Sequence, residues 1–205
     1  MEQDEFRTIA RPFEGFYKEK GSKFLGFAYP VQDEQQVKTI LDQLKSTYHD
    51  ARHHCYAYRL GPEGDTYRMN DDGEPSSTAG RPIFGQIQSH GLTNIVVVVI
   101  RYFAGTLLGT IGLIRSYKEA ADQALQQARI IKKTIQSLYE LEFDYTLMNE
   151  VMKVLHETGI QPYERDFQEK VTFRIGIRKS QEQQVIDQFK RIHQLKVNPV
   201  EAGNA

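Results

Sequence analysis

The run of six apolar residues from Ile95 to Ile100, IVVVVI, constrains the fold of this chain more than any other segment. Its apolar residues are continuous rather than alternating, which is typical of a strand that is covered on both faces. The run is also far too short to cross a bilayer as a helix. We therefore expect it to form a central strand of a sheet, in a domain that combines strands with helices.

The segments around this strand predict a first domain that ends near Lys133. Its expected strands span residues 13–17, 23–29 and 53–60, and its expected helices span residues 33–48, 82–88 and 113–131. Asp33 and Gln36 have the spacing of a helix start. The stretch from Gly61 to Gly80 is polar and has no periodicity, and a loop of this length in a compact domain is usually functional or disordered.

The pattern from Ser137 onward is more regular. Expected strands at residues 138–145, 160–166, 170–177 and 195–200 alternate with expected helices at 147–158 and 180–192. Ser180 and Gln183 resemble a capping box, and Gly159 is the expected end of the first of these helices. The resulting order, βαββαβ, is the ferredoxin-like arrangement. We therefore predict an α+β protein with two domains, residues 1–134 and 135–205.

Charge and cysteine content exclude several function classes. The net charge is −1 and neither residues 1–135 nor residues 136–205 carry a large basic excess, so any contact with RNA must be local. Cys55 is the single cysteine, so a secreted disulfide framework is excluded. The first residues, MEQDEFRTIARPFEG, contain no apolar signal segment. We expect a cytoplasmic protein with no membrane partner.

Three segments are richer in polar residues and glycine than packing requires: ARHHCYAY, NDDGEPSSTAGRP and RYFAGTLLGTIG. In the first, His53 and Cys55 share one face of a strand and His54 lies on the other. A structural zinc site needs about four ligands, which a single cysteine with these neighbours does not supply. We therefore expect no metal here. A partly buried histidine in a strand, with its hydrogen bonds satisfied, is the interpretation that we prefer to a metal ligand.

The second segment has two readings. Asp71, Asp72 and Glu74 have the oxygen ligands of a hard divalent cation, but the spacing of a calcium loop is missing. Alternatively, Asp72-Gly73 and Pro75 form a tight turn that leads into the next helix. A recognition loop and a structural turn both remain open.

The third segment places Gly105, Gly109 and Gly112 between a buried strand and a helix, where free backbone N–H groups attract anions. The spacing matches neither the P-loop nor the dinucleotide fingerprint. Close packing of strand and helix is the alternative role of these glycines. Just before them, Arg101 must find a partner or face a groove, either paired with an acid of the second segment or forming an exposed platform with Tyr102.

In this order and at these separations, ARHHCYAY, NDDGEPSSTAGRP and VVVVIRYFAGTLLGTIGLIRSY resemble the IMPACT family, specifically its bacterial YigZ-type branch. The resemblance covers approximately residues 15–130. It implies a first domain with the βαβ topology of domain 2 of small-subunit ribosomal protein five, of elongation factor G domain IV and of the GHMP kinases. The second domain is similar to domain V of elongation factor G. Ala104 and Ile111 depart from the family, which usually has glycine at both positions.

The resemblance also implies a function. Eukaryotic members of the family are linked to control of translation under amino-acid starvation, whereas bacterial members have no established biochemical activity. We therefore expect a translation-linked binding protein whose first domain recognises RNA, the ribosome or a translation factor, without a cofactor or a complete catalytic set. The groove is expected to contain Arg52, His54, Asp72, Glu74, Thr78, Arg101 and Tyr102, with Gly105, Thr106 and Gly109 as a phosphate-binding turn.

Two alternatives remain. One is an enzyme that acts on a nucleotide or a phosphorylated metabolite, in which the glycine turn holds phosphate and Asp71, Asp72 or Glu74 holds magnesium. The other is a protein-interaction adaptor that binds no nucleic acid, which agrees best with the near-neutral charge of both domains.

Overall fold

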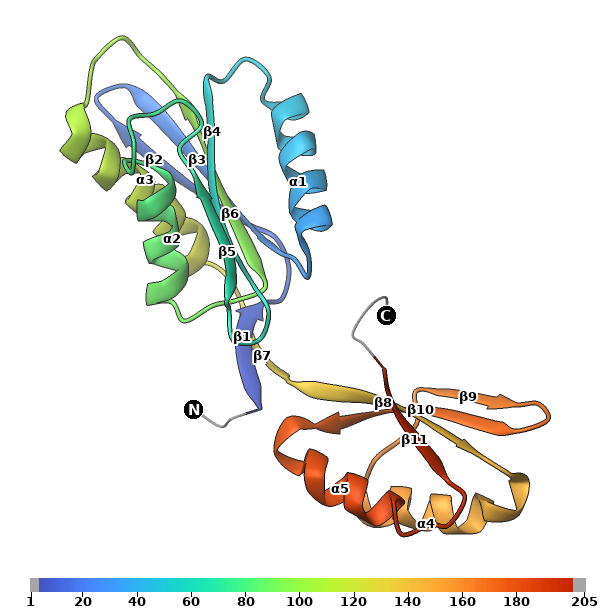
Figure 1. The fold of residues 1–205 in the computed structure, drawn as a ribbon. Coiled ribbons are helices and arrows are strands. Elements are labelled where there is room, and N and C mark those ends of the chain that lie inside the picture. The colour runs from blue at the N-terminus through green and yellow to red at the C-terminus, as the bar shows by residue number, and fades with distance from the viewer. Residues whose placement is uncertain (1–3, 201–205) are drawn as a thin grey trace. The chain divides into compact units, whose positions relative to one another are not determined.

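The computed structural model describes residues 4–200, which divide into two compact units (Figure 1). Phe6–Lys133 form the N-terminal unit, and residues 134–200 form the C-terminal unit together with Asp4 and Glu5. Strand β1 (Glu5–Ile9) pairs with β7 (Ile130–Thr134). The expected helix at 113–131 is therefore wrong at its end, because its last residues belong to β7.

A five-stranded sheet forms the centre of the N-terminal unit. Its strands are β2 (Phe13–Glu19), β3 (Ser22–Pro30), β4 (His53–Leu60), β5 (Thr66–Asn70) and β6 (Ile95–Tyr102), in the order β2-β3-β6-β4-β5. β6 is antiparallel to β3 on one side and to β4 on the other. The residues from Ile95 to Ile100 are fully buried, so the prediction of a central strand is confirmed.

Helices cover both faces of this sheet (Figure 1). α1 (Glu34–Thr47) lies on one face, and α2 (Gly80–Ser89) and α3 (Gly109–Gln126) lie on the other. Each face has its own apolar core. The expected start of α1 is confirmed, because Oδ1 of Asp33 accepts a hydrogen bond from the backbone N–H of Gln36 at 2.7 Å.

Two glycines hold α3 directly against the backbone of the sheet. A Cβ atom added at Gly26 would lie less than 3.0 Å from the carbonyl oxygen of Ala120, and one added at Gly15 would lie equally close to the backbone nitrogen of Ala124. Only glycine leaves room for this approach. The contact fixes α3 on β2 and β3, and so fixes where its N-terminal turn projects.

The polar stretch from Gly61 to Gly80 is not a continuous loop as expected. It contains β5, which pairs with β4 at the edge of the sheet. The first four residues of β5 are exposed, so side chains on both faces of this strand are in contact with solvent. The period-two pattern of a half-buried strand is therefore absent.

The C-terminal unit confirms the expected βαββαβ order. Its elements are β8 (Gln136–Phe143), α4 (Met148–Thr158), β9 (Glu164–Phe167), β10 (Val171–Arg178), α5 (Glu182–Phe189) and β11 (Lys196–Val200). Its strands form an antiparallel sheet in the order β11-β8-β10-β9. Gly159 ends α4 at a φ of 67°, as predicted.

The expected capping box at Ser180 is wrong. Ser180 lies in a 3-10 turn, η2 (Lys179–Gln181), and both its backbone N–H and its hydroxyl donate to the carboxylate of Asp4. Because Asp4 takes the side chain, Ser180 does not cap α5. No helix within residues 4–200 has the length and apolar character needed to cross a membrane.

Candidate functional site

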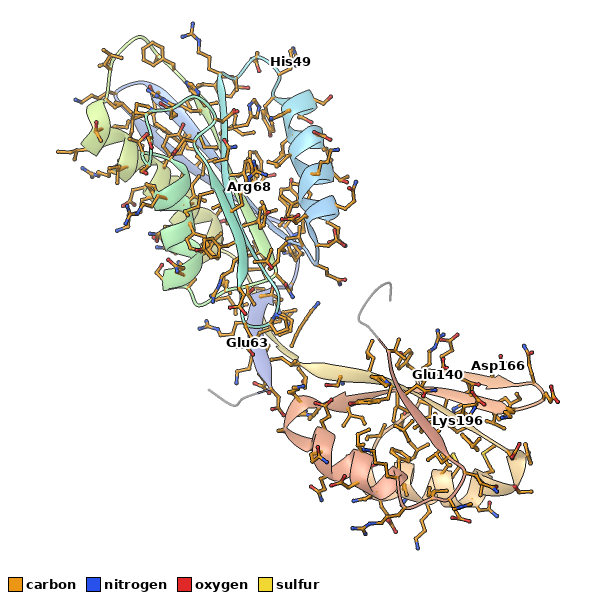
Figure 2. All side chains as sticks on the ribbon, in the orientation of Figure 1. His49, Glu63, Arg68, Glu140, Asp166 and Lys196 are labelled. Carbon is orange, nitrogen blue, oxygen red and sulfur yellow. The ribbon has the colours of Figure 1, made fainter. Side chains whose placement is uncertain are left out.

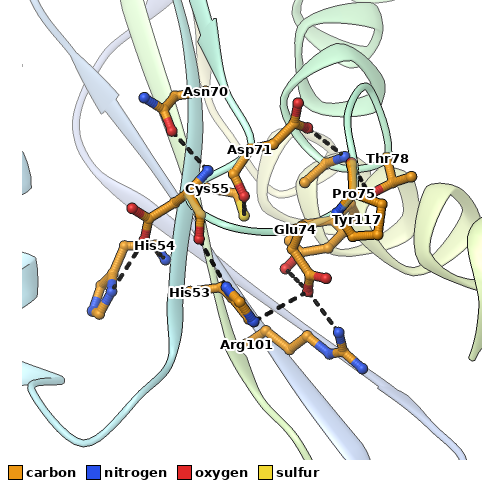
Figure 3. Close-up of polar contacts among 12 residues, drawn as sticks. His53, His54, Cys55, Asn70, Asp71, Glu74, Pro75, Thr78, Arg101 and Tyr117 are labelled. Carbon is orange, nitrogen blue, oxygen red and sulfur yellow. Dashed lines mark hydrogen bonds and ion pairs between the residues drawn. The ribbon is translucent and has the colours of Figure 1, made fainter. Parts of the chain in front are cut away.

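A buried ion pair lies at one end of the five-stranded sheet (Figure 3). Nη1 of Arg101, at the end of β6, lies 2.6 Å from Oε1 of Glu74, and the side chains are 6% and 4% exposed. Tyr117 on α3 donates its hydroxyl to the same oxygen at 2.8 Å. Of the three acids considered as partners of Arg101, Glu74 is therefore the one that pairs with it. The guanidinium also contacts the rings of Phe24 and Phe103, at 5.5 and 5.3 Å from their centroids.

Strand register brings His53 to the same place. His53 on β4 and Phe24 on β3 are both direct neighbours of Arg101 on β6, so the three side chains share one face of the sheet. His53 Nδ1 lies 2.8 Å from the carbonyl oxygen of Asp72, which can only accept, so this nitrogen carries the proton. His53 Nε2 lies 4.0 Å from Glu74. His53 and Tyr117 were missing from the expected groove, although shared strand parity with Arg101 indicates His53.

Asp71 is held by the backbone of the loop that precedes α2. Its carboxylate accepts hydrogen bonds from the backbone N–H groups of Ser77, Ala79 and Gly80, at 2.8 to 2.9 Å. Thr78 is buried and donates its hydroxyl to the carbonyl oxygen of Pro75 at 2.7 Å. The second polar segment therefore forms a structured turn that starts α2.

Asp72 is also committed to protein partners. Its Oδ2 accepts from the backbone N–H of His54 at 2.7 Å, and its own N–H donates to Oδ1 of Asn70. With Glu74 bound to Arg101 and Tyr117, each of the three acids has at least one short contact inside the protein. Within residues 4–200, no group of three or more His, Cys, Asp and Glu side chains is arranged to hold a metal ion.

Two of the expected groove residues lie on the opposite face of the sheet. His54 Nε2 lies 3.1 Å from the carbonyl oxygen of Tyr48, and burial lowers the pKa of His54. Tyr102 donates its hydroxyl to Oδ1 of Asp50 at 2.7 Å, and this hydrogen bond raises its pKa to about 12. Alternation along β4 and β6 explains the separation, because neighbours of His53 and Arg101 point the other way. The expected residues therefore do not share one groove.

Two cavities lie at this end of the sheet. The first, the Arg101 cavity, has a volume of about 480 Å³ and is lined by residues that include Arg52, His53, Glu74, Arg101, Phe103 and Leu107. The second, the Phe16 cavity, has a volume of about 500 Å³ and is lined by residues that include Phe16, Lys23, Leu25, Tyr102 and Phe103. Strand register puts Phe16, Lys23, Leu25 and Tyr102 on the face that α1 covers, whereas His53 and Arg101 point to the other face. The two cavities therefore lie on opposite faces of the sheet, and Phe103, which lines both, lies between them.

The glycine turn lies beside the Arg101 cavity, which Gly109 also lines. Gly105 and Gly109 have φ angles of +83° and +70°, and a Cβ atom at either would meet nothing within 4 Å. Backbone conformation rather than close packing therefore requires these two glycines. Thr106 is exposed. Leu108, the residue before α3, has no polar side chain and therefore does not cap the first backbone N–H groups of this 18-residue helix.

Cys55 is unsuited to nucleophilic catalysis. It is fully buried, its Sγ lies 3.0 Å from the carbonyl oxygen of Asp71, and burial raises the pKa of its thiol. A nucleophilic cysteine needs the thiolate form at neutral pH.

Charged side chains on the sheet of the C-terminal unit pair with one another. Glu142 accepts from Lys170 and Lys196, both at 3.0 Å, and Arg174 bridges Glu140 and Glu164. Figure 2 shows Glu140 and Lys196 on this sheet. Charges paired across neighbouring strands leave little net field for a phosphate backbone.

The chain is similar in sequence to known proteins. The family described as the Impact N-terminal domain matches residues 20–125, which include α1, α2, most of α3 and all the residues of the Arg101 cavity. IMPACT family member YigZ of Escherichia coli is 32% identical over 160 residues, which cover 77% of this chain and 78% of that protein. The Saccharomyces cerevisiae protein named Protein IMPACT homolog is 36% identical over 107 residues, which cover 48% of this chain and 41% of that protein.

A solved structure extends the likeness beyond the N-terminal unit. The crystal structure of a hypothetical protein superposes with a TM-score of 0.73 at 28% identity, covering 98% of this chain and 100% of that one. Both units are therefore present in a related protein of known structure.

Proposed function

This chain belongs to the IMPACT family, and on that premise we propose that it is a translation-linked binding protein that recognises RNA, the ribosome or a translation factor. Recognition is assigned to residues 1–134, and residues 135–205 orient that domain or add a contact. The translational link comes from what the resemblance implies for eukaryotic members, and the Saccharomyces cerevisiae relative matches 48% of this chain.

The proposal includes the finer likeness of the fold. A first domain like domain 2 of small-subunit ribosomal protein five and a second like elongation factor G domain V are both folds of the translation machinery. The element order of the C-terminal unit and the α-covered sheet of the N-terminal unit are compatible with them. Fold likeness alone does not assign a function.

The observation that carries the proposal is the rigid floor of the Arg101 cavity. Glu74, Arg101 and Tyr117 are locked together by two hydrogen bonds and are buried, while Arg52 and Leu107 at the same cavity are exposed. A preorganised floor with exposed charged and apolar walls is typical of a recognition surface.

The same contacts count against the enzyme alternative. Asp71, Asp72 and Glu74 each bind backbone or side-chain donors of the protein, so magnesium would have to compete with these contacts. The thiol of Cys55 has a raised pKa. The residues at the cavity offer binding groups rather than an acid, a base and a nucleophile in contact.

The test is affinity purification of the whole chain, with sequencing of bound RNA and mass spectrometry of bound proteins. The variant Arg52→Glu/Leu107→Ser changes two exposed residues of the cavity and leaves its floor intact. A matched control, Lys38→Glu/Met152→Ser, changes an exposed lysine on α1 and an exposed methionine on α4. We expect translation components to be retained by the wild type and the control and lost from the cavity variant. Identical partners for all three proteins would refute the proposed site.

A further inference from the structure

The surface around the two cavities is unusually apolar for an exposed region. Phe16 and Phe103 are 48% and 40% exposed, and Leu107 and Ile111 are 84% and 85% exposed. Phe16, Phe103 and Leu107 line the cavities, and Ile111 lies in the first turn of α3. We call these four residues the Leu107 patch. They lie around the end of the sheet, on both of its faces. Large exposed aliphatic and aromatic side chains around cavities mark interaction sites.

The charges that remain free at the cavities are positive. Among the described residues, Glu74 is the only acid that lines the Arg101 cavity, and Arg101 neutralises its charge. Exposed Arg52 lines that cavity, and exposed Lys23 lines the Phe16 cavity, which no acid among the described residues lines. The N-terminus of α3 adds partial positive charge, and its first turn contains no acidic residue. An acidic occupant fits these charges.

The patch favours protein over RNA as that occupant. Single-stranded RNA is bound by aromatic side chains that stack on bases and by a groove with many basic residues. Here two of the four patch residues, Leu107 and Ile111, are aliphatic and are the most exposed of the four, and the free basic side chains at the cavities are few. Exposed leucine and isoleucine contact apolar side chains of a protein partner, and such anchors supply most of the binding energy at protein interfaces.

From these observations we infer that an acidic protein segment docks across the two cavities, which deepens and rests on the proposed function. The segment crosses the end of the sheet at Phe103, and its apolar side chains enter the Arg101 cavity on one face and the Phe16 cavity on the other. Its carboxylates pair with Arg52 at the first cavity and with Lys23 at the second. Arg101 stays bound to Glu74 and forms the floor.

The test begins with random peptides displayed on phage and selected on the whole wild-type chain. Enriched peptides are synthesised with a fluorescent label and titrated by anisotropy against the wild type, Leu107→Ser/Ile111→Ser, Arg52→Glu/Lys23→Glu and the control Lys38→Glu. A labelled single-stranded RNA of random sequence is titrated in parallel at low and high salt. All the substituted side chains are exposed, and circular dichroism is used to check that each variant folds.

We expect peptides that combine aspartate or glutamate with large apolar residues. Their affinity should fall at least about tenfold in the Leu107 variant and several-fold in the charge-reversal variant, and stay unchanged in the control. Enriched peptides without acidic residues, or peptides that bind all variants equally, would overturn the inference. RNA that binds through the same residues with a steep salt dependence would also overturn it but would leave the proposed function standing.

Discussion

Arg101 and Glu74 form a buried ion pair at the floor of the Arg101 cavity, with 2.6 Å between Nη1 and Oε1. Buried pairs of this kind are costly to break from one side, because the remaining charge has no partner. Nη1 of Arg101 and Oε1 of Glu74 are therefore not free binding groups. The pair instead holds the loop before α2 against the end of β6, and it gives the Arg101 cavity a fixed floor.

Single and double substitutions of this pair should differ in a characteristic way. Glu74→Leu leaves Arg101 buried without its partner, so the free energy of unfolding should fall by about 3–5 kcal/mol. Glu74→Leu/Arg101→Met removes both charges and should cost less than Glu74→Leu alone. Urea denaturation measures the free energy of unfolding of both variants. Tyr117→Phe is the control, because the hydroxyl of Tyr117 also loses its acceptor when Glu74 is replaced. A double variant that costs as much as Glu74→Leu alone, or more, would contradict this expectation.

Stability should depend on pH through His54. Burial lowers its folded-state pKa below the ordinary value of 6.5, so between these two values the unfolded chain binds more protons than the folded chain. The contribution of His54 is complete above pH 6.5 and is lost as the pH falls towards the folded-state pKa. Urea midpoints should therefore decrease with falling pH in the wild type and decrease less in His54→Gln. The exposed His49 provides the control, and His49→Gln should follow the wild type.

Two glycines with open space around them should respond oppositely to alanine. Gly105 has a φ of +83°, so Gly105→Ala should lower the free energy of unfolding by about 1–2 kcal/mol. Gly85 lies inside α2 with an ordinary φ, so Gly85→Ala should raise it by about 0.5–1 kcal/mol. A Cβ meets nothing within 4 Å at either position, so the comparison isolates backbone conformation. Equal effects of the two substitutions would show that φ is not the cause.

Asp71 should contribute to stability rather than to metal binding. Asp71→Ala removes the acceptor of three backbone N–H groups at the start of α2, and we expect a loss of about 2 kcal/mol in the free energy of unfolding. Asp65→Ala at an exposed position should have little effect. Thermal unfolding followed by circular dichroism compares the two. If Asp71→Ala unfolds at the wild-type melting temperature, Asp71 does not stabilise the start of α2.

The pattern of apolar residues in the sequence predicts the central strands of the two units better than the strands at their edges. The continuous run at Ile95–Ile100 and the alternation of Val171, Phe173, Ile175 and Ile177 both reflect burial, and both segments are strands as expected. β5 has mostly exposed residues, so burial leaves no signature in its sequence. β1 and β7 pair across more than 100 residues, and a local pattern contains no information about such a partner.

The candidate site shows the same limit. Alternation along the strand predicts that His53 and Cys55 share a face. Which residue of the next strand lies beside His53 depends on strand register, and the register places Arg101 there. Once the register is known, His54 and Tyr102 must face α1. The choice of Glu74 over Asp71 or Asp72 as the partner of Arg101 depends on the path of the loop, which turns at the positive φ angles of Asp72 and Gly73.

The most direct test of the recognition surface is photo-crosslinking in living cells that express the whole chain. A photoreactive amino acid replaces Leu107 in one protein and Lys38 in a second, both at exposed positions. After irradiation, adducts are identified by mass spectrometry and RNA sequencing. The account predicts adducts with a component of the translation machinery from position 107 and not from position 38. The absence of adducts at position 107, or the same adducts from both positions, would contradict it.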